Sequence, residues 1–156
     1  MSINIRQKGA SGEREIADQL NTCINVVRME LGLPVLAKPQ VQRNQNQTAV
    51  GGCDLVGTYG YAIEVKRHEQ LSINTWWKQC KTSAQELDKM PVLVFRQNKQ
   101  KWRVVTETFV PIPDTGRGML VRAEIDWEDF KKMFMQAARY ELEQNKQDPN
   151  NQTLFA

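Results

Sequence analysis

Residues 51–69 read GGCDLVGTYGYAIEVKRHE, and this stretch decides the fold. Two runs in it, CDLVGT and YAIEVK, have the composition of β-strands, and a tight Tyr-Gly connection joins them. Side chains alternate across a strand, so Glu64 and Lys66 share one face. We therefore expect a β-hairpin that directs Asp54, Glu64 and Lys66 toward one spot while its other face builds core.

Asp54 and Glu64 bring two carboxylates together, and such groups repel each other unless a cation lies between them. Ligands that offer only oxygen favour a hard ion such as Mg²⁺ or Mn²⁺. That ion polarises a phosphoryl oxygen and lowers the pKa of bound water, which Lys66 could position or deprotonate. The alternative is an exposed hairpin face, where a Glu64–Lys66 pair contributes roughly 0–1 kcal/mol. The apolar residues that flank each charge favour the site.

A helix is expected from Ser11, a plausible N-cap, to the Gly32 and Pro34 that end it. Glu13 is in line with the apolar stripe of this helix and would add a third carboxylate to the site. The alternative is a first-turn glutamate that complements the helix dipole. The stripe consists of Ile16, Leu20, Ile24, Val27 and Leu31.

The rest of the chain completes an α-β-β-α-β-β-α order, which predicts an α/β fold with helices on a central mixed sheet. We expect one domain over residues 1–144, with residues 1–10 as a flexible basic arm and residues 145–156 as a disordered tail. The further elements are a helix at 74–87 with Ala84 and Leu87 on its inner stripe, strands at 90–95 and 101–107, a loop at 111–118, and a helix after Asp126 with Phe130, Phe134 and Ala137 inward.

Composition sets the class of protein. The chain has 156 residues and a net charge of +3. Through Val105 there are 15 basic and 9 acidic residues, against 6 and 9 afterwards, so the basic part suggests a polyanion such as nucleic acid. A solvated basic surface is the alternative. No apolar run has the length of a membrane span, and the three cysteines are scattered. We expect a reduced, cytoplasmic protein without a membrane partner, in the host cytoplasm if a phage encodes it.

These residues resemble the signature of the PD-(D/E)XK nuclease superfamily, in which Asp in one strand and Glu-x-Lys in the next follow a helix that carries Glu. Here the matching residues are Asp54, the run Glu64-Val65-Lys66, and Glu13. Within the superfamily, residues 8–20, KGASGEREIADQL, are similar to the opening of archaeal-type Holliday junction resolvases. Two departures are Cys53, where relatives often have proline, and the segment after Thr106, which lies outside the pattern. That segment could serve dimerisation or pack on the sheet.

The resemblance implies a restriction-endonuclease-like core and metal-dependent hydrolysis of a DNA phosphodiester, with Mg²⁺ as the cofactor and Mn²⁺ as a substitute. Lys66 would handle the attacking water. Gln79 on the following helix is a candidate to line the site, and a solvated glutamine is the alternative. The implied metal ligands are Asp54, Glu64, the carbonyl of Val65, and Glu13 directly or through water.

Two further sets of residues suggest contacts with DNA. Of Trp76 and Trp77, only one is expected to face the core, and the other could stack on a base. Seven basic residues are candidate phosphate contacts, each with a solvated charge as the alternative: Arg6, Lys8, Lys38, Arg43, Arg67, Lys78 and Lys81.

The sequence as a whole indicates a structure-selective DNA endonuclease of phage type that resolves four-way junctions. Symmetric cleavage of a junction needs two active sites, so we expect a homodimer. A restriction- or repair-type nuclease of the same superfamily, a DNA-binding relative without activity, and an interaction domain with surface charges are the alternatives.

Overall fold

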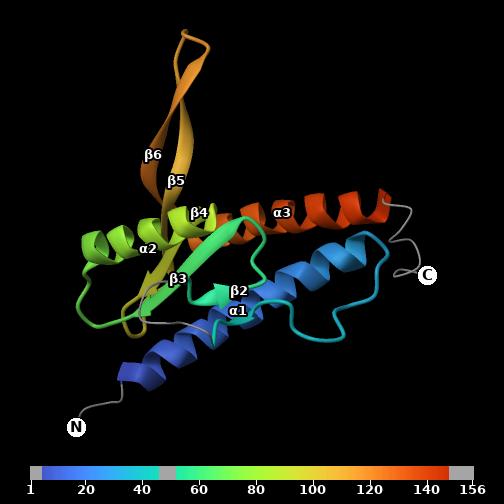
Figure 1. The fold of residues 1–156 in the computed structure, drawn as a ribbon, viewed down its shortest axis with the longest axis horizontal. Coiled ribbons are helices and arrows are strands. Elements are labelled where there is room, and N and C mark those ends of the chain that lie inside the picture. Colours follow the sequence, from blue (N-terminus) through green and yellow to red (C-terminus); the bar gives the residue numbers. More distant parts are fainter. Residues whose placement is uncertain (1–4, 46–51, 148–156) are drawn as a thin grey trace.

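The computed structural model describes residues 5–45 and 52–147 (Figure 1). Their order is α-β-β-β-α-β-β-β-α, which adds a short strand after the first helix and a long strand before the last helix to the elements that the sequence predicts. The elements are α1 (Ile5–Glu30), β1 (Gln42–Arg43), β2 (Leu55–Val56), β3 (Tyr61–Arg67), α2 (Ile73–Leu87), β4 (Met90–Arg96), β5 (Arg103–Ile112), β6 (Arg117–Asp126) and α3 (Trp127–Gln147).

The main sheet has the order β3-β4-β5-β6 and is mixed, as expected. β3 and β4 run parallel, with Glu64 beside Leu93, and α2 makes the crossover between them. β4 and β5 are antiparallel, with Leu93 beside Val105, and β6 pairs with β5 in the same manner. β3 is therefore the edge strand of this sheet, and it carries the Glu-x-Lys run.

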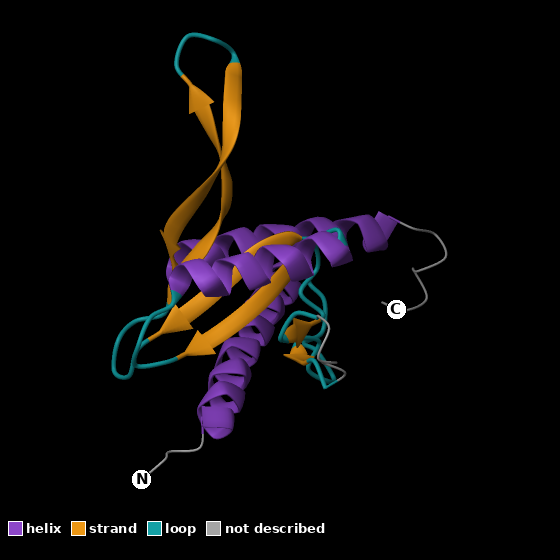
Figure 2. Cartoon of the chain, turned by 60° about the vertical axis from the view of Figure 1, so that its left-hand side comes forward, coloured by secondary structure: helices purple, strands orange, loops and turns teal. Residues whose placement is uncertain are grey.

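Helices cover both faces of the sheet (Figure 2). Ile63 and Val65 of β3 point into the main core, where α1 and α3 pack, as the alternation along the strand predicts. α2 covers the opposite face through a second cluster. Because Glu64 is in register with Leu93 of that cluster, its side chain lies on the α2 side of the edge strand. The second cluster contains Trp76, Trp77, Cys80, Leu93, Phe95 and Val105.

Both ends of the described chain are more helical than expected. α1 begins at Ile5, so Ser11 is not its N-cap, Glu13 is not in its first turn, and the flexible arm is wrong for residues 5–10. Arg6, Gln7, Lys8 and Ala10 all have good helix propensity, which outweighs about 1 kcal/mol for the Gly9 among them. α3 reaches Gln147, which corrects the expected tail for residues 145–147. Residues 1–4 and 148–156 lie outside the described chain.

The expected hairpin at residues 53–66 has no paired ladder. β2 is two residues long and pairs antiparallel with β1, with Leu55 beside Arg43. Gly57 has a positive φ of 78° and lies directly against the backbone of Gln40, so this segment follows β1 rather than β3. Asp54 precedes β2 in a bend, and the expected alternation is lost there. Cys53 packs against Ala62 and Ala84 on the α2 side, whereas Leu55 belongs to the main core.

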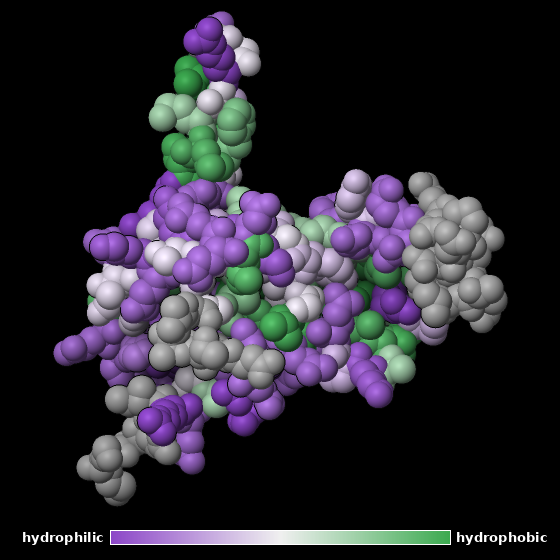
Figure 3. Space-filling view, in the orientation of Figure 1, coloured by the Kyte–Doolittle hydropathy of each residue, from purple (hydrophilic) through white to green (hydrophobic). Residues whose placement is uncertain are grey.

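The loop expected at residues 111–118 is wrong, because only residues 113–116 form a turn. β5 and β6 extend on either side of it, from Glu107 beside Arg122 to Ile112 beside Arg117. The ladder of β4 with β5 ends at Thr106, so the two strands continue past the sheet as a ribbon. We call residues 108–121 the arm. Figure 3 shows it standing clear of the body, with an apolar band below its polar tip.

Three smaller expectations about helix faces are also corrected. Trp76 and Trp77 are both buried, because Trp76 packs across the start of α2 against Phe95 and the ring of His68. Ala138 rather than Ala137 is fully buried on α3, in line with Phe130 and Phe134. Leu87, expected on the inner stripe of α2, is 43% exposed. All three cysteines are buried thiols outside any disulfide. In the described ranges, none of the helices combines the length and apolarity needed to cross a bilayer.

Candidate active site

Asp54 lies against the open edge of β3. Its backbone N–H donates to the carbonyl of Ile63 at 3.0 Å, and its Oδ2 accepts from the N–H of Val65 at 2.7 Å. Edge strands present unpaired backbone groups, and here a carboxylate occupies the position that a neighbouring strand would take. A hydrogen bond to a charged acceptor is stronger than a neutral one, so Asp54 is fixed beside Glu64.

Asp54 and Glu64 are both buried, at 9% and 8% exposure. Burial, the charge of Asp54 and the hydrogen bond between the two carboxyl groups together raise the pKa of Glu64 from 4.5 to about 9. Lys66, half-buried on the same strand face, acts in the opposite direction. Near neutral pH the pair therefore carries one proton and one negative charge, and a divalent cation would take the place of that proton.

Glu13 is the third carboxylate at this position. Its pKa is raised by burial and by the charge of Asp54, while the hydrogen bond from Arg43 lowers it. The Nε of Arg43 lies 2.5 Å from the Oε2 of Glu13, so β1 supplies a cation to this acid. Arg43 was expected to contact phosphate, and this pairing could not be predicted because 30 residues separate the partners.

Gly12 explains how α1 comes close enough to place Glu13. A Cβ on Gly12 would lie 3.3 Å from the indole of Trp102 and 3.6 Å from the side chains of both Val65 and Arg67. The helix thus crosses β3 where its smallest residue faces the strand. Sequence reasoning missed this positioning role, although a glycine directly before the helix glutamate was a visible signal. Glu15 points elsewhere, because it accepts from Trp102 and pairs with Arg96.

The donors at this site suit a hard divalent ion, since Asp54 and Glu64 offer only oxygen. Within residues 5–45 and 52–147, however, no group of three or more His, Cys, Asp or Glu side chains is arranged to hold a metal. Glu13 would complete such a set only by leaving Arg43. The residues present therefore fit a centre built on two carboxylates, and the ligand roles predicted for Glu13 and for the Val65 carbonyl stay predictions.

Gln79 is exposed on α2, so its role at the site also stays a prediction. The next residue, Cys80, is the one that faces β3, with its Sγ 4.0 Å from the carbonyl of Ala62. Burial and the neighbouring Glu64 raise the pKa of the Cys80 thiol to about 12. This thiol is consequently a packing group beside the acids and not a nucleophile.

The predicted phosphate contacts fall into two groups. Four of them already have polar partners: Lys8 with Glu69 at 3.5 Å, Lys81 with Glu107 at 3.2 Å, Arg67 with Asn98 at 3.2 Å, and Arg43 with Glu13. Arg6, Lys38 and Lys78 are exposed and accessible to a polyanion. All seven contacts remain predictions.

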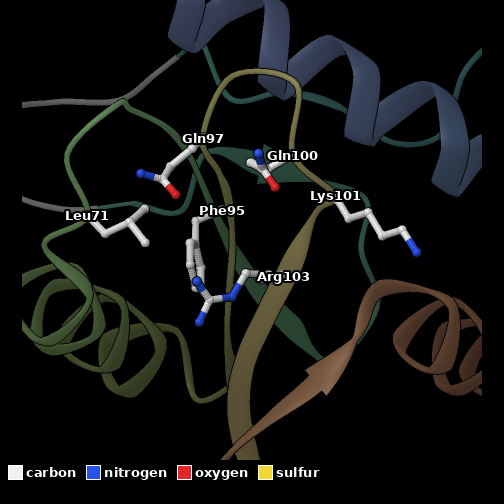
Figure 4. Close-up of a pocket in the computed structure, with 6 residues that line it drawn as sticks. All are labelled: Leu71, Phe95, Gln97, Gln100, Lys101 and Arg103. Carbon is white, nitrogen blue, oxygen red and sulfur yellow. The ribbon is translucent and has the colours of Figure 1, made fainter.

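A hollow of about 270 Å³ lies one strand away from Lys66, because Phe95 in its wall is in register with that residue. Figure 4 shows the guanidinium of Arg103 beside the Phe95 ring and Lys101 directed away from it. A second hollow of about 580 Å³ shares Gln100, Lys101 and Arg103 with the first. Residues 101–107 were expected only as a strand, and the basic surface that Lys101 and Arg103 form there was not predicted. The first hollow is lined by Leu71, Phe95, Gln97, Gln100, Lys101 and Arg103.

A family model, a curated protein and a solved structure are similar to this chain. The model of a family described as "Phage putative PDDEXK endonuclease" matches residues 4–152. A curated relative, Protein D14 of Escherichia phage T5, is 23% identical over 131 residues, which span 73% of this chain and 78% of that protein. Among solved structures, Hjc of Archaeoglobus fulgidus, a Holliday junction resolvase, matches with a TM-score of 0.46 and 16% identity, over 80% of this chain and 96% of Hjc.

Proposed function

Because this chain belongs to the phage PDDEXK endonuclease family and is a nuclease of that type, we propose that it is a Mg²⁺-dependent DNA endonuclease selective for branched structures. Four-way junctions are the proposed substrate, and two copies of the chain are the proposed active form. The proposed location is the host cytoplasm, where buried thiols such as Cys53 and Cys80 stay reduced.

One observation carries the proposal: two carboxyl groups, at 9% and 8% exposure, meet at the open edge of β3. Two buried acids in contact destabilise a fold when both are ionised, because their charges repel. Their burial here therefore indicates a function. The Val65 N–H holds Asp54 in this position, and Lys66 follows two residues after Glu64 on the same face. An exposed face with surface charges, the alternative from the sequence, does not account for this burial.

Asp54 and Glu64 would hold Mg²⁺ or Mn²⁺, which supplies Lewis-acid polarisation of the phosphate when it is bound. Lys66 would orient or deprotonate the attacking water and offset negative charge on the phosphate in the transition state. Arg43 holds Glu13 out of this set in the structure. We propose that Glu13 joins the acids, directly or through water, when Arg43 turns to a DNA phosphate.

The preference for junctions rests on the resemblance of residues 8–20 to the opening of archaeal-type resolvases, whereas the set of Asp54, Glu64 and Lys66 is common to the superfamily. Symmetric cleavage by such an enzyme needs two copies of the site, related by a twofold axis. The exposed residues Arg6, Lys38 and Lys78, together with Lys101 at the hollow beside Phe95, would contact the phosphates of the arms.

The test is cleavage of a labelled four-way junction beside a linear duplex of matched sequence, with Mg²⁺ or EDTA. Wild type should make paired, symmetric nicks in the junction alone. Asp54→Asn should abolish them, whereas Asp18→Asn, which changes an exposed acid on α1, should have no effect.

Other outcomes would redirect the proposal. Equal cutting of the duplex would discard junction selectivity and favour a restriction- or repair-type nuclease. Tight DNA binding without cleavage by any divalent metal would indicate a relative that has lost its activity. Cleavage that persists in EDTA would contradict the metal-based mechanism.

A further inference from the structure

The arm, residues 108–121, exposes large apolar side chains that nothing in the described chain covers. Five of them are well exposed: Phe109 at 67%, Val110 at 44%, Ile112 at 39%, Met119 at 58% and Leu120 at 59%. Scattered single apolar residues on a surface are ordinary, but a contiguous apolar band marks an interaction site. The band in Figure 3 is contiguous along the ribbon.

Both faces of the arm are apolar. Phe109 and Leu120 are cross-strand partners on one face, and Val110 and Met119 are partners on the other. The ring of Phe109 occupies the space beside Gly118, where a Cβ would lie 2.2 Å from it. A lone two-stranded ribbon is marginally stable in water, so this one requires material packed on it.

The tip of the arm is built as a rigid turn. Asp114 and Gly116 adopt positive φ angles of 65° and 67°, which suit these two residue types. The hydroxyl of Thr115 donates to the carbonyl of Ile112 at 2.9 Å and accepts from the N–H of Arg117 at 3.0 Å. A ribbon closed in this way keeps its strand register, and with it the apolar pattern on each face.

Charge argues against DNA as the occupant of the apolar band. The arm contains one acid, Asp114, and one base, Arg117, so its net charge is zero. Surfaces that bind DNA are strongly positive, because the phosphates dominate their affinity. The ribbon also leaves the sheet at the end opposite to Lys66, since Lys66 is level with Arg103 and the arm begins beyond Thr106. It therefore points away from the candidate site.

We infer that the arm is the dimerisation surface, and that its occupant is the arm of a second copy of this chain, packed antiparallel about a twofold axis. The charges lie at the tip and at the root pair of Glu107 and Arg122, with the apolar band between them. An antiparallel pair of arms therefore places band on band and the tip of each arm beside the root of the other. Such a contact uses the same patch on both copies, as a twofold interface requires.

The five apolar side chains offer on the order of 500 Å² in one copy, the size of a patch that marks an interaction site. They are divided between two faces, so a specific interface of roughly 1,000 Å² also includes residues beside the band. The inference rests on the proposed function for the dimer itself and adds the arm as the surface through which the two copies associate. It does not depend on the reaction, because no residue of the arm lies at the acids.

The test measures the oligomeric state by light scattering and cleavage in parallel. Wild type should be a dimer, and Phe109→Asp combined with Met119→Asp, one change on each face, should raise its dissociation constant about 100-fold or more. The control is Met29→Asp on α1, which removes an apolar side chain of equal exposure, 66%, away from the arm. A second variant joins Glu107 to Arg122 through an Asn-Gly turn and removes the arm entirely.

A cross-linking experiment fixes the geometry. Leu120→Cys should form a covalent dimer with a short bis-maleimide reagent, because the twofold axis brings the two bands together. The native thiols of Cys23, Cys53 and Cys80 are buried and give the background with wild type. The armless variant should be a monomer, and its melting temperature should be unchanged. It should cut one strand of the junction at a time and make no paired cuts.

The outcomes separate the dimer surface from the proposed reaction. A dimer that persists without the arm, or a Leu120→Cys variant that does not cross-link to itself, would overturn the arm as the dimer surface while the proposed reaction stands. A wild type that is monomeric would overturn both the arm contact and paired cleavage. Loss of cleavage in Asp54→Asn alone, with the dimer intact, would leave this inference unaffected.

Discussion

The acid site and the arm both depart from the usual distribution of residues: the site buries charged groups, and the arm exposes apolar ones. At the site, Asp54 and Glu64 are carboxylates buried to 9% and 8% exposure, where charge is costly. On the arm, Phe109 and Leu120 are large apolar groups at 67% and 59% exposure, open to water. A bound cation would offset the charge of the acids, and an apolar partner would cover the side chains of the arm.

The two regions also differ in how the fold holds them. The site is enclosed by α1, β3 and the segment before β2, and Gly12 sets the distance between helix and strand. In the described chain, the arm is held by its own ladder and, at its root, by the pair of Lys81 with Glu107 and the hydrogen bond from Arg122 to Asn74. Changes at the site should therefore alter chemistry and fold stability, whereas changes on the arm should alter assembly.

The largest effect should follow from the removal of the amine at the site. Lys66→Met keeps the length of the side chain and should slow junction cleavage about 100-fold or more, because a positioned proton-transfer group contributes that much. Dimerisation should be unchanged. Single-turnover rates would measure the effect, with Lys132→Met on α3 as the exposed control. A loss of less than threefold would remove Lys66 from the mechanism.

Next in size is a change at Gly12. Gly12→Leu should cost about 1–3 kcal/mol of unfolding free energy, because its side chain would enter the contact with Trp102 and Val65. Gly9→Leu is the matched control, since a Cβ there meets nothing within 4 Å and the same helix gains a better helix former. Urea denaturation compares them. Equal stability of the two variants would show that the close crossing of α1 over β3 is not required.

The buried pair predicts an unusual dependence of stability on pH. The pKa of Glu64 is raised from 4.5 to about 9 in the folded state, so the folded protein holds a proton that the unfolded chain releases. This contribution to stability is complete below pH 4.5 and is lost as the pH rises through about 9.

Glu64→Gln should abolish this dependence. In EDTA at alkaline pH the variant should melt several degrees above wild type, and near pH 4.5 the two should be alike. The cause is that the amide is neutral at every pH and can keep a hydrogen bond to Asp54. Thermal melts across the pH range measure it, and parallel curves for the two proteins would contradict a shared proton.

The smallest effects should come from Lys78 and Lys81, three residues apart on α2. Lys78 is exposed, so Lys78→Ala should weaken DNA binding and lower the slope of log affinity against log salt by about one. Lys81→Ala should instead cost less than about 1 kcal/mol of stability through the lost Glu107 pair, with little change in the salt slope. Salt titrations of both would show whether the root of the arm is also a DNA contact.

The acid pair could be predicted because the two acids are close together in the sequence. Asp54 and Glu64 lie ten residues apart with apolar neighbours, and two short strands can bring such positions together. The predicted hairpin was wrong, because Asp54 reaches β3 from a bend, where Gly57 lies against Gln40. That contact, like the pair of Glu13 with Arg43, joins distant segments and leaves no periodic signal.

The arm could not be predicted for the opposite reason. Periodicity identifies a strand by one apolar face and one polar face, and residues 108–121 are apolar on both faces and interrupted by proline and glycine. Such a pattern is typical of a loop in an isolated chain. It becomes a strand pair because β5 and β6 continue their ladder through it, and the first half of β5 is anchored in the core by Val104 and Val105.

The most direct test of the central claim is calorimetric titration of Mn²⁺ into the metal-free protein, for wild type and for Asp54→Asn combined with Glu64→Gln. If the two buried carboxylates form the metal centre, wild type should bind Mn²⁺ in a saturable manner and the double variant should not bind it, while melting at a higher temperature in EDTA. Binding of equal strength to both proteins would contradict the account, because the metal would then be held elsewhere.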